Sequence, residues 1–121
     1  MNILWVALGG AIGSVLRYLI STSTLRWGSY LPWGTLTVNV AGCFFIGFFL
    51  PIGLIKVPVP MRLFLMTGVL GGLTTFSTFS FECWSFFLAG QWAQGLLNIA
   101  LNLGLSLLAA GLGYWTACRL I

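Results

Sequence analysis

The chain has 121 residues, of which 60% are hydrophobic and only 5% are charged. Soluble domains carry about 25% charged residues, so this composition argues against a water-soluble fold. One acidic residue and no histidine leave almost nothing for acid–base catalysis. Five scattered basic residues form no positive face for a nucleic acid. We therefore expect an all-α integral membrane protein that is not an enzyme and binds no nucleic acid.

The three cysteines, Cys43, Cys83 and Cys118, lie singly within apolar stretches. Their spacing matches neither a disulfide framework nor a pair of metal ligands. We interpret them as small buried thiols, and nothing in the sequence indicates an organic cofactor.

Apolar runs predict four transmembrane helices, because about 20 apolar residues are needed to cross the hydrocarbon of a bilayer. Tryptophans lie near the expected ends of these helices, as in an interfacial aromatic belt. The N-terminus has no basic region before its apolar run, so it is interpreted as the first crossing and not as a cleavable signal. The four helices and their short loops make one domain over residues 1–121, with crossings at 3–20, 33–50, 61–88 and 96–118.

The distribution of positive charge leaves the orientation open. One side of the membrane would hold Lys56, Arg62 and Arg119, and the other side would hold Arg17 and Arg26. This bias is weak, so it is compatible with a single orientation or with insertion both ways and pairing of inverted copies. Four helices are too few to enclose a polar pathway, which favours an oligomer. Surfaces for close helix contact are offered by three pairs of small residues: Gly9 and Gly13, Gly68 and Gly72, and Ala109 and Gly113.

Polar residues recur at helical spacing inside two of the expected crossings. The second crossing has Thr35, Asn39 and Cys43 on one face, and the fourth has a stripe about 12 Å long made of Asn98, Asn102 and Ser106. Polar groups inside a membrane need partners and often mark ion pathways. The alternative is that these side chains only form hydrogen bonds to a neighbouring helix.

The third crossing contains the most informative run, residues 68–80. Two adjacent glycines are followed by five hydroxyl residues within seven positions: Thr74, Thr75, Ser77, Thr78 and Ser80. Both residue classes weaken a helix, which predicts a break near mid-membrane within residues 71–80. The alternative is a kinked but closed helix whose hydroxyls bond to their own turn.

Phe76 and Phe79 lie inside this run, each flanked by hydroxyl residues. The edge of a phenylalanine ring carries partial positive charge, so it attracts an anion without holding it as a fixed cation would. Together with hydroxyl and amide donors, the two rings indicate an ion pathway, and the ion is expected to be an anion.

Three motifs resemble those of the Fluc (CrcB) family of bacterial fluoride channels. They are the segments at 9–18 (GGAIGSVLRY), 34–42 (GTLTVNVAG) and 71–80 (GGLTTFSTFS), with Glu82 following the last. The resemblance covers the whole chain, and the third motif is the most specific.

The resemblance implies an antiparallel, dual-topology homodimer with two fluoride pores. Phe76 and Phe79 match the rings that face fluoride, and the pore would also be lined by Asn39, Thr35, Thr75, Ser77, Thr78, Asn102 and Ser106. Gly71 and Thr74 match positions whose backbone carbonyls hold a structural Na⁺ at the dimer interface. Arg17 matches a structural arginine. The asparagines on the fourth helix depart from the hydroxyl residues that are usual there.

The function implied is a passive channel that exports F⁻ from the cytoplasm across the bacterial inner membrane and so relieves fluoride toxicity. The alternative is a small multidrug exporter, which is also built of four short crossings. That class uses a membrane-embedded carboxylate in its first helix, whereas here the first helix carries Arg17 and no acid. Glu82 is open to two interpretations: a buried group bonded where the third helix restarts, or a member of the exit route.

Overall fold

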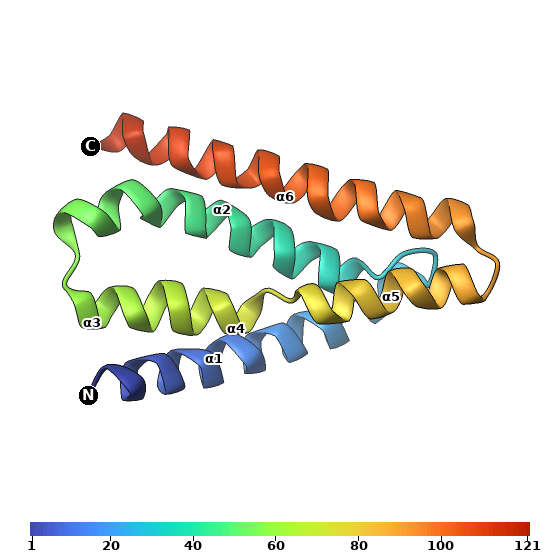
Figure 1. Ribbon diagram of the computed structural model, residues 1–121, viewed down its shortest axis with the longest axis horizontal. Coiled ribbons are helices and arrows are strands. Elements are labelled where there is room, and N and C mark those ends of the chain that lie inside the picture. The colour runs from blue at the N-terminus through green and yellow to red at the C-terminus, as the bar shows by residue number, and fades with distance from the viewer.

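The computed structural model describes residues 1–53 and 56–121, and every regular element in that part of the chain is a helix. Helix α1 (Asn2–Ser23) continues into a short 3₁₀ turn, η1 (Thr24–Trp27), and α2 (Trp33–Lys56) follows. The third crossing consists of α3 (Val59–Arg62), the π-helix η2 (Leu63–Leu70), α4 (Gly71–Leu73) and α5 (Phe76–Leu88). Helix α6 (Trp92–Leu120) ends the chain, and both termini lie at the end where α2 connects to α3 (Figure 1).

The described part of the chain contains four segments that are long and apolar enough to cross a membrane. They are Asn2–Trp27, Trp33–Gly53, Val59–Leu88 and Trp92–Leu120. The prediction of an all-helical protein with four long apolar helices is thus confirmed. The helices run a few residues beyond the expected limits at several ends, since α1 reaches Ser23 and α6 begins at Trp92.

The third crossing is interrupted near the middle of its length, where a short extended link joins α4 to α5 (Figure 1). Thr74 has a ψ of 153°, and Thr75 has φ and ψ of −150° and 120°, so both residues are extended. The interruption lies within the predicted range of 71–80 and falls on Thr74 and Thr75, whereas Gly71 and Gly72 remain helical. The π-helix that precedes it was not predicted from the sequence.

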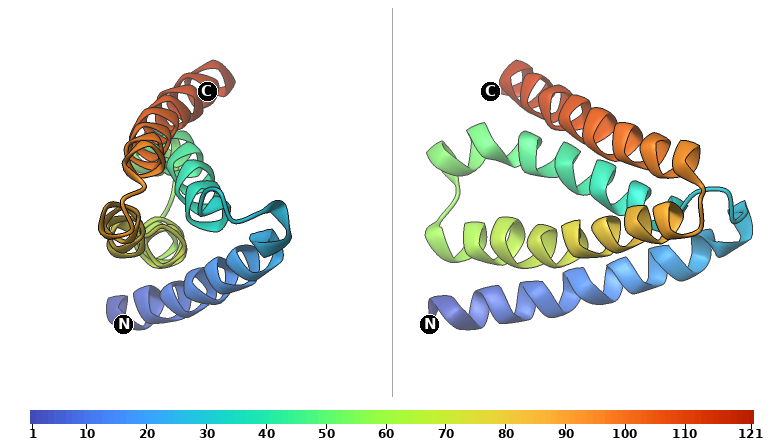
Figure 2. Two further views of the ribbon diagram at one scale, coloured as in Figure 1. Left: turned by 90° about the vertical axis from the view of Figure 1, so that its right-hand side faces the viewer. Right: turned by 45° about the vertical axis from the view of Figure 1, so that its right-hand side comes forward.

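The helices pack in two pairs, which the end-on view separates clearly (Figure 2). One pair is α2 with α6, and the other is α1 with the first half of the third crossing. The small residues of the sequence motifs lie inside these pairs. A Cβ at Gly13 would lie against the carbonyl oxygen of Val69, and a Cβ at Gly113 would lie against that of Phe44.

The small residues were expected to offer surfaces for close helix contact, and Gly13 and Gly113 do so by bringing backbones together within one chain. The buried apolar core is correspondingly small and centres on Val38, Leu70 and Leu73. Many large apolar side chains face outward instead, as expected of helices that contact lipid or another subunit.

The packing at Gly13 generates a first prediction. Gly13→Ala should destabilise the protein by about 3 kcal/mol, because the added methyl group meets backbone that cannot move aside. Gly10→Ala is the matched control on the same helix, since a Cβ there has no neighbour within 4 Å in the chain. Thermal unfolding in detergent, followed by circular dichroism, measures both. Equal stability of the two variants would contradict the packing.

Candidate functional site

The break in the third crossing is held by Asn39, a buried residue of α2. The Thr75 N–H donates to Asn39 Oδ1 over 2.9 Å, and Asn39 Nδ2 donates to the Thr75 carbonyl over 3.2 Å. One side chain thus pairs both backbone groups of an extended residue. Such groups cost several kcal/mol each when they are left unpaired in hydrocarbon, so Asn39 is what makes this non-helical residue tolerable at this depth.

Thr75 also starts the helix that follows the break. Its Oγ1 accepts a hydrogen bond from the Thr78 N–H over 3.2 Å, which is the usual N-cap arrangement. The same hydroxyl donates to Thr78 Oγ1 over 3.1 Å. Thr78 Oγ1 accepts the hydrogen in that bond. The hydroxyl hydrogen of Thr78 itself bonds to no group within residues 1–53 and 56–121. The hydroxyl of Thr78 is therefore available to a ligand.

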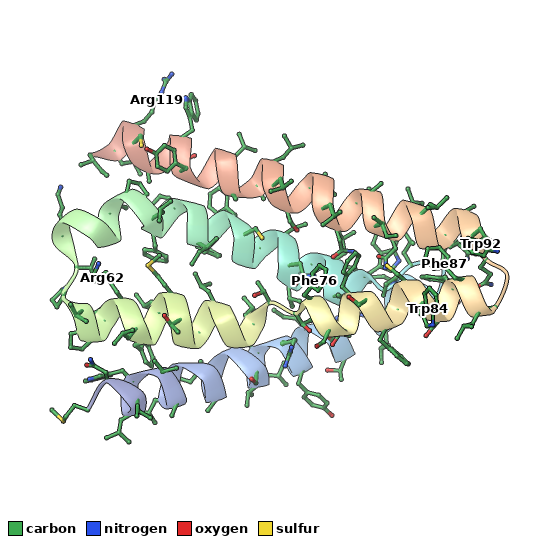
Figure 3. The ribbon with its side chains drawn as sticks, in the orientation of Figure 1. Arg62, Phe76, Trp84, Phe87, Trp92 and Arg119 are labelled. Atoms are coloured by element: carbon green, nitrogen blue, oxygen red, sulfur yellow. The ribbon has the colours of Figure 1, made fainter. Side chains whose placement is uncertain are left out.

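A groove of about 280 Å³ lies on one side of the break, between α2, α5 and α6. Phe79 is buried in it, whereas Phe76 is 72% exposed. The two ring centroids are 5.4 Å apart, and Figure 3 marks Phe76 just past the extended link. Ser106 Oγ is buried here and has no hydrogen-bond partner among the described residues. The other lining residues include Asn39, Cys43, Thr74, Thr75 and Asn102.

A second cavity, of about 350 Å³, opens at the end of the molecule where η1 connects α1 to α2. Its inner wall carries Thr35, Thr78 and Glu82. Thr35 Oγ1 donates to Glu82 Oε1 over 2.5 Å, which ties α2 to α5. In the described part of the chain Glu82 Oε2 is buried without a partner. The bond to Thr35 fixes one carboxylate oxygen of Glu82, and Glu82 also lines the cavity, so both interpretations of this residue stay predictions.

A hydrogen bond between the hydroxyls of Thr75 and Thr78 joins the linings of the two cavities. Thr75 lines the groove, Thr78 lines the outer cavity, and their oxygens are 3.1 Å apart. Neither lining contains a lysine or an arginine, and their one charged residue, Glu82, lies in the outer cavity. The arrangement therefore offers a small anion a line of neutral donors and ring edges that attract it weakly enough to permit release.

Two backbone carbonyls near the break have lost their helical donors. The partner of the Gly71 carbonyl would be the Thr75 N–H, which bonds Asn39 instead. The partner of the Thr74 carbonyl would be the Thr78 N–H, which bonds Thr75 Oγ1. Both residues line a smaller pocket of about 150 Å³. Carbonyl oxygens without donors are suitable ligands for a hard cation, so these residues fit the implied Na⁺.

The structure separates some of the residues that the sequence grouped together. Ser77 is exposed and lines neither cavity, although its Oγ lies 3.4 Å from Thr75 Oγ1. Arg17 lies on α1, away from both linings, and makes no hydrogen bond or ion pair within residues 1–53 and 56–121. Cys43 lines the groove beside Asn39, as their spacing of four on one face of α2 indicated.

Comparison with known proteins adds evidence independent of this geometry. Residues 4–114 match the family model described as CrcB-like protein, Camphor Resistance (CrcB). The chain belongs to the CrcB family. Members named "Fluoride-specific ion channel FluC" are similar to it over nearly their whole length. One from Magnetococcus marinus is 46% identical and one from Rhizobium johnstonii is 51% identical, each over 93% of this chain and 94% of the relative. One from Desulfotalea psychrophila is 48% identical over 92% of this chain and 89% of the relative.

The N-cap of α5 generates a prediction for this CrcB protein. Thr75→Val removes the hydroxyl that accepts from the Thr78 N–H and should cost about 1 kcal/mol of stability. Thr75→Ser retains the hydroxyl and should cost much less. Chemical or thermal unfolding in detergent compares the two. If the valine variant were as stable as the serine variant, the cap would have no energetic role.

Proposed function

We propose that this chain is a fluoride-specific ion channel, like the relatives that carry that name. One observation supports this most strongly: a membrane-crossing helix is interrupted beside two cavities, and each cavity has a free hydroxyl donor and no basic side chain. A small anion loses hydration when it enters such a path, and oriented neutral dipoles compensate for that loss without trapping the ion.

The proposed route runs from the outer cavity, past Thr35 and Thr78, to Thr75 and then along the groove. The Thr78 and Ser106 hydroxyls have hydrogens to offer to the ion, one in each cavity. Ser77 lies close enough to Thr75 to contribute if it turns toward the route. The edges of Phe76 and Phe79 provide the remaining attraction. We assign structural roles to Glu82, which ties α2 to α5, and to Arg17.

An antiparallel homodimer is part of this proposal. The groove is open along one side, and Phe76 is mostly exposed in the single chain. An ion in that groove would contact lipid unless another subunit covered it. An inverted second copy supplies the missing wall, and two copies form two equivalent pores. The weak charge bias between the two ends of the chain is compatible with insertion in both orientations.

We further propose that Gly71 and Thr74 hold a structural Na⁺ through their backbone carbonyls. Two carbonyls are too few for a Na⁺ ion, and the equivalent pair from an inverted partner would double the number. The ion would supply positive charge to backbone oxygens that the break has left without donors. In this chain Asn39 and Thr75 prepare the site, because they take the N–H groups that would otherwise occupy those oxygens.

The physiological role proposed is passive export of F⁻ through the inner membrane of a bacterium. In acidic surroundings fluoride enters as HF and dissociates in the cytoplasm, and the anion then needs a conduit to leave. The rival function, a small multidrug exporter, is disfavoured because α1 has no carboxylate and the chain's one acidic residue lies on α5.

The function is tested by fluoride efflux from liposomes that contain the purified protein and internal potassium fluoride. Valinomycin carries K⁺ so that voltage does not limit efflux, and a fluoride electrode measures it. Phe76→Ile and Phe79→Ile should each reduce efflux about tenfold or more, because the ring edges are lost. Phe81→Ile is the matched control, since Phe81 is 72% exposed on α5 and lines neither cavity.

Efflux that persisted unchanged in both ring variants would mean that the rings only pack. Absence of efflux with the wild-type protein, in liposomes shown to be sealed, would refute the channel. Ethidium uptake driven by a pH gradient would favour the exporter instead.

Dual topology has a separate test. A single cysteine added after Ile121, in a variant with its own three cysteines replaced by alanine, is labelled in intact cells by a membrane-impermeant maleimide. About half of the molecules should react, because the charge bias favours neither orientation strongly. Labelling of all molecules, or of none unless the cells are broken, would show a single orientation and remove the antiparallel dimer.

A further inference from the structure

A series of hydrogen bonds through asparagine side chains connects α5, α6 and α2 and ends at the break in the third crossing. Asn98 and Asn102 on α6 are 1% and 3% exposed. Asn98 Nδ2 donates to Cys83 Sγ over 3.2 Å, and Asn102 Nδ2 donates to Asn98 Oδ1 over 2.9 Å and to the Asn98 carbonyl over 3.1 Å. Asn39 Nδ2 then donates to Asn102 Oδ1 over 3.0 Å. Asn39 completes the chain by pairing both backbone groups of Thr75.

The two middle residues of this hydrogen-bonded series, Asn39 and Asn102, use all of their side-chain amide hydrogens within the protein. An amide group has two hydrogens, and Asn39 Nδ2 has two acceptors, the Thr75 carbonyl and Asn102 Oδ1. Asn102 Nδ2 also has two acceptors, both on Asn98. Although Asn39 and Asn102 line the groove, no amide hydrogen of either remains for an ion.

The bonds also fix which way each amide points. If Asn39 were reversed, its NH₂ group would face the Thr75 N–H, donor against donor. A reversed Asn102 would place its NH₂ group against that of Asn39 and its oxygen against the carbonyl of Asn98. Asn98 therefore orients Asn102, Asn102 orients Asn39, and Asn39 holds Thr75 in its extended conformation.

We propose that Asn98 and Asn102 are positioning residues, which set the geometry of the break through Asn39 and do not contact the ion. The effect of this geometry on transport rests on the proposed channel function, whereas its effect on the backbone of residues 71–80 does not. Asn98 gives the clearest case, because it lines neither cavity and yet lies two hydrogen bonds from Asn39.

The next polar residue of the same stripe has the opposite character. Ser106 lies one turn beyond Asn102 and also lines the groove, but its hydroxyl takes no part in the amide chain and is unpaired within residues 1–53 and 56–121. On α6, therefore, Asn102 supports the break, whereas Ser106 is placed to contact the ion.

Hydrogen–deuterium exchange of the purified full-length protein in detergent, read by mass spectrometry on peptides that cover residues 71–80, tests the proposal. Asn102→Ala should raise the exchange rate of the slowest amide in this segment about tenfold, because Asn39 loses a partner and its hold on the Thr75 N–H weakens. Asn98→Ala should raise the rate in the same direction by a smaller factor. Ser106→Ala is the matched control and should leave the rate unchanged.

Fluoride efflux of the same three variants completes the test. Asn98→Ala should reduce efflux although Asn98 is remote from both cavities, and Ser106→Ala should reduce it with no change in exchange. Wild-type exchange and efflux in Asn98→Ala would overturn the proposal, as would a loss of efflux in Asn102→Ala with unchanged exchange. If Asn102→Ala failed to fold, Asn98→Ala alone would decide. A wild-type protein without efflux, but with the expected exchange pattern in the variants, would refute the channel and leave the positioning role intact.

Discussion

The architecture depends on pairing the backbone groups that become free where the third membrane crossing is interrupted. Inside hydrocarbon no water is available to bond them, so protein groups must do so. Asn39 bonds the N–H and the carbonyl of Thr75, and Thr75 Oγ1 accepts from the Thr78 N–H. These bonds take the donors that the carbonyls of Gly71 and Thr74 would otherwise have. An opened helix and two carbonyl oxygens without their usual helical donors are thus consequences of the same few contacts.

The function proposed follows from what lies beside that opening. A closed helix would present only side chains to the groove, whereas the interruption aligns the hydroxyls of Thr75 and Thr78 between two cavities. The unpaired Ser106 hydroxyl and the rings of Phe76 and Phe79 continue the line. Neutral donors suit a strongly hydrated anion that has to leave as readily as it enters, and they make a basic side chain unnecessary in the path.

Much of this could be predicted from the sequence, for reasons that differ between elements. Four apolar runs of membrane-spanning length require four helices. The two adjacent glycines and the hydroxyl-rich run after them predicted the interruption. The residues that extend, Thr74 and Thr75, could not be identified, because that choice depends on Asn39 in another helix. The π-helix over Leu63–Leu70 carries no local signal. The spacing of Asn98 and Asn102 predicted that they share a helix face. It did not predict that the side-chain amide hydrogens of Asn39 and Asn102 would all bond to other protein groups. The bond between Thr35 and Glu82 joins residues 47 positions apart, and no local pattern indicates it.

Oriented neutral dipoles at an interrupted crossing should pass fluoride and discriminate against other anions. The most direct measurement is the reversal potential of the purified protein in a planar bilayer, with a fluoride gradient and equal chloride on both sides. The reversal potential should lie close to the Nernst potential of fluoride. A reversal potential near zero, where chloride is at equilibrium, would contradict it.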